Sequence, residues 1–157
     1  MSWRAFSAVC AALFLLSSCS PGADQPQSGL PKDHIVIDTP HGPVAFDVDM
    51  ATTEPQRQKG LMFRDHLGKH EGMLFDFGRE DFRAFWMKNT MVSLDMLFIK
   101  ADGTISTIAE DTTPYSEAPV PSSEPVRAVL EIAGGESRAQ GIESGQKVHA
   151  KIFGNGP

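Results

Sequence analysis

The sequence predicts a mainly β domain of the α+β class, a small antiparallel sandwich or barrel of about seven strands with one or two short helices. Apolar and polar residues alternate with a period of two in several short runs, as they do in half-buried strands. Turns rich in Gly, Pro and Asp separate these runs, and only two stretches carry helix signals. The 157 residues leave room for one domain with an ordinary core.

The domain begins with a predicted β-hairpin. Residues 34–39 and 44–50 alternate between apolar and polar side chains, and a Pro-His-Gly-Pro turn joins them. Thr53 is then expected to cap a short helix, in which Gln56 completes a capping box and Gly60 marks the end.

The clearest strand of the chain is residues 94–100, because both of its faces are apolar except at Asp95. Such a strand belongs in the centre of a sheet, where Asp95 needs a partner, and we expect Lys88 or an arginine to supply it. Further strands are expected at residues 73–77, 84–88, 105–110, 126–132 and 147–153, with a short helical turn at 134–141.

A long connection at residues 111–125 contains four prolines and Tyr115. Structureless loops of this length often form the lid or wall of a binding site. A stiff, proline-pinned crossing that covers a sheet edge explains the composition equally well. Both interpretations stay open at this stage.

The N-terminus has the features of an export signal. Arg4 precedes an uncharged apolar run from Ala8 to Leu16, which is too short to span a bilayer of about 30 Å as a helix. The end of this run, Leu-Ser-Ser-Cys, resembles the bacterial lipobox, which implies cleavage before Cys19 and lipid attachment to its sulfur. An ordinary signal peptide cleaved near Ala23 is the alternative.

These features predict three segments. We expect a signal peptide at 1–18, a lipidated cysteine and flexible tether at 19–33, and a single globular domain at 34–157. Several acyl chains on one cysteine hold a protein stably on a bilayer. The predicted localisation is therefore the cell envelope, with the domain facing the periplasm or the cell exterior.

Charge and cysteine content exclude several functions. Without Arg4, 13 of the 14 cationic residues remain against 20 acidic ones, so the exported chain carries about −7 and is a poor general binder of nucleic acid. Cys10 lies in the signal and Cys19 would be acylated, which leaves the domain no thiol for a disulfide, a nucleophile or a soft metal.

The common hydrolase, nucleotide and metal motifs are also absent from the sequence. His66 and His70 have the spacing of a helical metal pair, but Gly68 between them argues against a helix. We therefore expect neither a metal nor a cofactor.

The best place for a site is the segment Phe85–Thr90, which combines an aromatic ring, a cation and an amide. If the segment is extended, Phe85 and Met87 point to the core, while Trp86 and Lys88 face outward. Aromatic stacking with directed polar groups suits a small polar, carboxylated or glycan-like ligand. The predicted ligand-binding residues are Arg57, Arg64, Trp86, Lys88, Asn89, Asp95 and Tyr115, and the candidate acid/base residues are Asp95 and Glu131.

Several ordered motifs resemble the bacterial and archaeal family called domain of unknown function 192. They are Gly60–Arg64, Gly72–Phe77, Phe85–Thr90, Leu94-Asp95, Val129–Glu131 and Gly141-Ile142. The resemblance covers nearly all of residues 34–153, and it implies a compact, mainly β domain that is often exported or lipid-anchored, with no assigned activity. This chain has Val92-Ser93 where the family often has a proline before Leu-Asp.

Three functions remain open. The first is a binding module at the membrane for a small polar or glycan-like ligand, held between Trp86 and the neighbouring cations. The second is an enzyme for cell-envelope glycans or their fragments, with Asp95 or Glu131 as the acid or base. The third is a structural partner of another envelope protein, which would use the aromatic segment as an interface.

Overall fold

A computed structural model describes residues 24–157, so the predicted signal peptide and the predicted lipidation of Cys19 lie outside the described residues. The described chain is mainly β, with nine strands and two short α-helices. The elements are β1 Lys32–Thr39, β2 Gly42–Ala51, α1 Glu54–Lys59, β3 Glu71–Asp81, β4 Ala84–Phe85, β5 Leu94–Ile99, β6 Ile105–Thr112, β7 Val120–Pro121, β8 Val126–Ala133, α2 Glu136–Gln140 and β9 Val148–His149, followed by a 3₁₀ turn at Lys151–Phe153.

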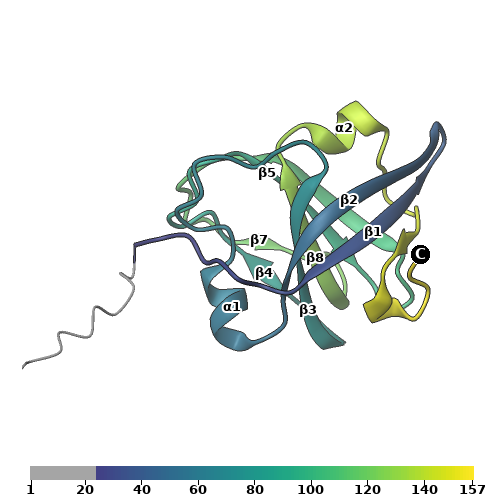
Figure 1. The fold of residues 1–157 in the computed structure, drawn as a ribbon, viewed down its shortest axis with the longest axis horizontal. Coiled ribbons are helices and arrows are strands. Elements are labelled where there is room, and N and C mark those ends of the chain that lie inside the picture. The colour runs from purple at the N-terminus through teal and green to yellow at the C-terminus, as the bar shows by residue number, and fades with distance from the viewer. Residues whose placement is uncertain (1–23) are drawn as a thin grey trace, which may run out of the picture.

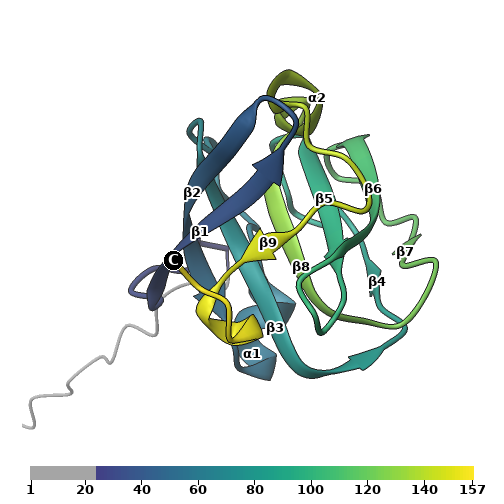
Figure 2. The ribbon, with the colours of Figure 1, turned by 90° about the vertical axis from the view of Figure 1, so that its right-hand side faces the viewer.

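Seven of these strands form one curled sheet in the order β6-β5-β8-β3-β2-β1-β9, and β4 and β7 form a separate ribbon (Figure 1). The curl makes a half-barrel. Its two edge strands, β9 and β6, come together at one end, where Val148 N–H donates to Gly103 O and Ile105 N–H donates to Gln146 O. Figure 2 shows β9 between β1 on one side and β6 on the other. The expected mainly β architecture is confirmed.

One strand pair departs from the antiparallel expectation, because β2 and β3 run parallel. Parallel neighbours need a crossover of a dozen or more residues rather than a tight turn, and α1 with the polar loop after it supplies one. The Thr53–Gln56 capping box is present, with Gln56 Oε1 3.0 Å from the Thr53 N–H. Gly60 ends the helix at φ 48°, a value that favours glycine.

Two hydrophobic cores lie on the two faces of the sheet. The inner core fills the curl and contains Leu74, Leu97 and Leu130 from the three central strands. The outer core covers the opposite face and contains Phe75 and Val129. Since side chains alternate along a strand, each central strand contributes to both cores, which explains why β5 is buried throughout, as predicted.

The outer core is covered by α1 and by the segment that contains β4. Only Ala84 and Phe85 of this segment form a strand, but its side chains point as expected. Met87 is 1% exposed, and the Phe85 ring packs edge-on against Phe75, Phe77 and Phe98. The proline-rich connection runs alongside: β7 pairs with β4, and Ser116 O accepts from Met87 N–H. It therefore supports the β4 segment as a rigid crossing.

Several predicted boundaries differ from the structure. β1 begins at Lys32, earlier than expected, because the residues before it already contact the domain. Gln27 Nε2 donates to the carbonyl oxygens of Gln56 and Gly60, at 3.1 and 2.8 Å. β3 continues to Asp81, beyond the expected end at residue 77, because β8 pairs with it again at Val126.

Candidate functional site

The structure contains a pocket of about 240 Å³ between α1 and the β4 segment. One wall consists of residues 54 and 57–62, from α1 and its end, and the other consists of Ala84–Trp86. The outer face of the sheet supplies the floor, through Phe75 and Phe77 of β3 and Glu131 of β8. The pocket thus opens beside the segment that the sequence indicated.

Glu131 is the unusual residue of this pocket. It is 4% exposed, and its cross-strand neighbours are Met73 and Met96, so an acidic group lies between two apolar side chains. Within residues 24–157 its carboxyl group has no hydrogen bond or ion pair. Burial raises its pKa to about 8, because the charged form loses its hydration without gaining a partner. At neutral pH the group is therefore a protonated acid that can donate a hydrogen bond.

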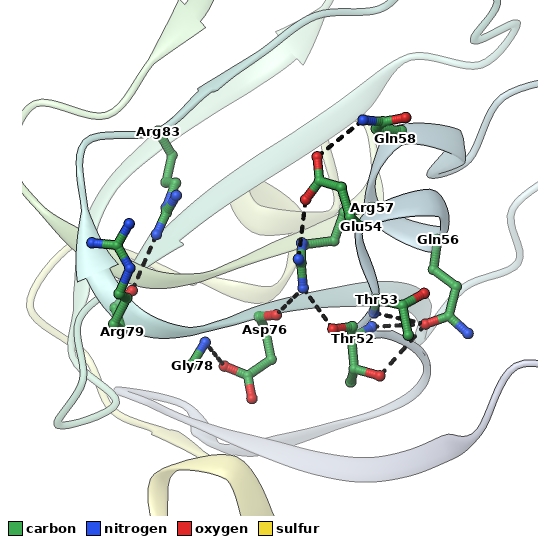
Figure 3. Close-up of polar contacts among 10 residues, drawn as sticks. All are labelled: Thr52, Thr53, Glu54, Gln56, Arg57, Gln58, Asp76, Gly78, Arg79 and Arg83. Atoms are coloured by element: carbon green, nitrogen blue, oxygen red, sulfur yellow. Dashed lines mark hydrogen bonds and ion pairs between the residues drawn. The ribbon is translucent and has the colours of Figure 1, made fainter.

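Arg57 is held rigidly at the edge of the pocket by three acceptors (Figure 3). Its Nη1 donates to Thr52 O and Asp76 O at 2.6 and 2.9 Å, and its Nη2 donates to Glu54 Oε2 at 3.1 Å. Its Nε is buried without an acceptor among the described residues. The Glu54–Arg57 ion pair lies within α1, whereas the bond to Asp76 O joins α1 to β3 through an Arg57 side chain that is only 18% exposed.

Two further charged residues, Glu54 and Arg83, lie close to Arg57. Hydrogen bonds from Arg57 and then from Gln58 lower the pKa of Glu54, so this carboxylate is ionised in the same pocket in which Glu131 is protonated. The guanidinium carbons of Arg57 and Arg83 lie 5.1 and 4.1 Å from the centre of the Phe77 ring, which favours cations over its face. Burial is the main reason why the pKa of Arg83 is lowered.

Trp86 is the part of the predicted segment that reaches the pocket. It lines the opening, is 48% exposed, and has Lys88 Nζ 5.1 Å from its ring centre. Asn89 adopts a left-handed conformation, φ 54°, and its carbonyl accepts from Phe63 N–H. Lys88 and Asn89 do not line the pocket. Lys88 covers the Trp86 ring, and Asn89 shapes the turn that follows it.

The prediction that Lys88 or an arginine pairs with Asp95 is wrong. Within residues 24–157 no cation contacts this buried carboxylate; instead Oδ1 accepts from the N–H groups of Asp111 and Gly135, and Oδ2 accepts from Ser137 N–H. These bonds join β5, the end of β6 and the start of α2, and satisfy a helix N-terminus. By the alternation of β5, Asp95 shares a face with Leu97 of the inner core, whereas Glu131 shares a face with Val129 of the outer core. The two predicted acid/base residues therefore lie on opposite sides of the sheet.

Two other predicted ligand-binding residues also lie outside the pocket lining. Arg64 pairs with Asp49, where Lys32 also binds. Tyr115 is 60% exposed, and its N–H donates to Thr90 O. Arg64 binds near the end of β2, and Tyr115 lies on the proline-rich crossing.

Of the residues singled out in the sequence, the structure brings Arg57, Trp86 and Glu131 together around one pocket. Sequence reasoning missed Glu54 as a second pocket carboxylate and Phe77 as the ring beneath two guanidinium groups. The sequence carried no clear signal that Glu131 is buried, because alternation groups it with Arg127 and Val129, opposite the apolar face of the strand.

The described residues contain neither a metal-binding cluster nor a membrane-spanning helix. No cluster of three or more His, Cys, Asp or Glu side chains in residues 24–157 is arranged to hold a metal ion. Within the same range, no helix has the length and apolar character needed to cross a membrane.

Residues 36–150 match the sequence profile of DUF192, described as Uncharacterized ACR. The chain belongs to the DUF192 family. The match covers most of the half-barrel, from β1 through β9, and confirms the resemblance seen in the sequence motifs. A search of curated proteins found no match.

Two solved structures resemble this DUF192 chain, each with 39% sequence identity. One is a protein of Sinorhizobium meliloti 1021, provisionally described as a transcription regulator; the TM-score is 0.78, and the match covers 80% of this chain and 98% of that one. The other is a protein of unknown function from Novosphingobium aromaticivorans DSM 12444, with a TM-score of 0.76 and coverage of 83% and 94%.

Proposed function

We propose that this DUF192 domain is a binding module for a small polar ligand, and that the ligand occupies the pocket between α1 and Trp86. The observation that carries the proposal is the unpartnered carboxyl group of Glu131 on the pocket floor. Burying a polar group without a hydrogen bond costs free energy, and native proteins keep few such groups outside functional sites. A ligand that accepts a hydrogen bond from Glu131 removes this cost.

The rest of the pocket supports a ligand with both a flat face and polar edges. Trp86 offers a half-exposed ring at the opening, and Arg57 supplies a positioned cation on the opposite wall. Aromatic rings stack on sugar faces and on other flat groups, while guanidinium groups fix polar edges. A volume of about 240 Å³ suits a monosaccharide-sized molecule or one unit of a longer glycan.

The proposal includes the predicted location. A lipid on Cys19 would hold the domain at the cell envelope, and the residues between the anchor and β1 would set its distance from the bilayer. Gln27, which binds the end of α1, would be the first point of that connection to hold the pocket wall.

Calorimetric titration with small polar molecules tests the binding proposal. We expect saturable binding at millimolar concentration or tighter, and we expect Trp86→Ala to weaken it about tenfold, since an aromatic contact contributes about 1–1.5 kcal/mol. Phe82→Ala is the matched control, because Phe82 is 64% exposed but does not line the pocket. Equal losses in the two variants, or no binding by the unaltered protein, would refute the proposal.

A second candidate function is acid/base catalysis on envelope glycans, favoured by the two unlike carboxyl groups of the pocket. Glu131 is held protonated by burial, while hydrogen bonds from Arg57 and Gln58 hold Glu54 ionised. A pair of carboxyl groups whose pKa values are pushed apart is the arrangement of a general acid with a general base. In this function Glu54 takes the place that the sequence had suggested for Asp95.

Incubation with envelope extracts tests the catalytic candidate. A product that disappears in both Glu131→Gln and Glu54→Gln supports it. Turnover that survives in both variants removes these carboxyl groups from the mechanism. If the protein binds a ligand but turns over no substrate under any condition, the function is that of a binding module.

A further inference from the structure

The donors and acceptors of the pocket are unequal in number, which restricts what it can bind. Arg57 has five N–H hydrogens, of which three meet Thr52 O, Asp76 O and Glu54 Oε2. The Nε hydrogen has no acceptor in the described chain. Protonated Glu131 adds an O–H donor without an acceptor. Two Arg57 hydrogens and the Glu131 O–H, three donors in all, therefore have no partner among the described residues.

The ionised acceptor of the same pocket, Glu54, already receives a hydrogen bond at each of its oxygens. Glu54 Oε1 accepts from Gln58 Nε2 at 3.0 Å, and Glu54 Oε2 accepts from Arg57. A ligand hydroxyl brings a donor hydrogen as well as an acceptor, so it finds fewer partners here than a group that only accepts. A group with acceptor oxygens alone fits the remaining donors best.

The charge of the lining residues favours an anion for a second, independent reason. The charged residues that line the pocket are Glu54, Arg57 and Lys59, all from α1, and the titratable Glu131 from β8. With Glu131 protonated these sum to one positive charge, and with Glu131 ionised they sum to zero. The strands next to Glu131 add no charge, since its neighbours there are Met73 and Met96.

We propose that the occupant of this pocket is a small carboxylate, which accepts a hydrogen bond from the Glu131 carboxyl and faces the positive charge of Arg57. The inference rests on the proposed binding function and names its ligand class. An acid O–H to a carboxylate oxygen is a short, charge-assisted hydrogen bond, among the strong ones found in proteins. A phosphate dianion needs more donors than the pocket has left, and its second charge exceeds the single positive charge of the lining.

The arrangement makes binding depend on a proton. Glu131 must carry its hydrogen to donate, and ionised Glu131 repels a carboxylate. Affinity is therefore constant below the pKa of Glu131, which burial raises to about 8, and falls tenfold for each pH unit above it. Between pH 6 and pH 9.5 we expect a loss of about 30-fold.

Matched pairs of probes test the inference on the full chain by calorimetry. Glucuronate is compared with glucose, and lactate with propane-1,2-diol, because each pair differs at the carboxylate. We expect the carboxylates to bind at least about tenfold more tightly at pH 6, as a charge-assisted hydrogen bond contributes more than 1.4 kcal/mol. At pH 8.5, titrations in buffers of unlike ionisation enthalpy should show uptake of about 0.7 proton per ligand, and almost none at pH 6.

Glu131→Gln is the decisive variant, because an amide keeps a donor at this position but does not titrate. It should bind glucuronate at pH 6 and keep the same affinity to pH 9.5, with no proton uptake. Equal affinity for the members of each pair, or binding by the unaltered protein that ignores pH, overturns the carboxylate inference and leaves the binding module intact. Binding of neither class overturns both proposals.

Discussion

Replacing Glu131 with glutamine should change how the stability of the domain depends on pH. The side chain keeps its size, but its ionisation is removed. In the wild-type protein the pKa of Glu131 rises from an ordinary value of 4.5 to about 8 on folding, so the folded state holds this proton more tightly than the unfolded chain does. The stabilisation from that proton is complete below pH 4.5 and is lost as the pH rises to about 8.

The magnitude follows from the same two values. A difference between 4.5 and about 8, at about 1.4 kcal/mol for each pH unit, gives at most about 5 kcal/mol. This is a large part of the 5–15 kcal/mol typical of a domain. Relative to wild type, Glu131→Gln should therefore gain about 4 kcal/mol in its free energy of unfolding between pH 4.5 and pH 8.5.

Urea unfolding at closely spaced pH values measures this difference, because other ionisable groups affect both proteins equally. Glu143→Gln provides the control, since Glu143 is exposed and its replacement should follow wild type within about 0.5 kcal/mol. Parallel curves for wild type and Glu131→Gln would show that the carboxyl group is not held protonated, and would refute the account of the pocket floor.

Three further outcomes follow from other parts of the chain. Asp95→Asn should destabilise the domain by about 3 kcal/mol in urea, because an amide leaves buried N–H groups unpaired, and should leave pocket affinity unchanged; a shift in affinity would contradict the separation of the two faces. Gln27→Ala should cost about 1 kcal/mol, whereas Gln25→Ala, at an exposed residue, should cost nothing measurable; equal effects would contradict the contact with α1. Cys19→Ala should move the exported protein from the membrane to the soluble fraction on cell fractionation, and unchanged partitioning would exclude a lipid on Cys19.

The parts of the fold that depend on local chemistry could be predicted from the sequence. The hairpin turn, the Thr53–Gln56 capping box and the alternation of Phe85 and Met87 each depend on neighbours within a few residues. The parallel β2–β3 pair and the insertion of β8 between β3 and β5 depend on distant segments, which no local pattern specifies.

The candidate site shows the same division. Asp95 and Glu131 look alike in sequence, since both are acidic residues in buried strands. What separates them is distant: Asp95 receives N–H groups from residues 16, 40 and 42 positions away, while no such group reaches Glu131. Burial could be inferred for Asp95, whose strand is apolar on both faces, but not for Glu131, which alternates with Arg127 and Val129, and the partners of neither could be inferred.

The place of β8 in the sheet bears on how the chain folds. The strands of the main sheet that precede it form two groups, β1–β2–β3 and β5–β6, which do not pair with each other. β8 joins them, and its residues come after position 125, so the central sheet is incomplete until most of the chain is available. Long-range pairing of this kind is slow compared with hairpin formation. Assembly of the central sheet should therefore wait until nearly the whole chain is available, and Glu131 enters its apolar surroundings on the strand that joins the two groups.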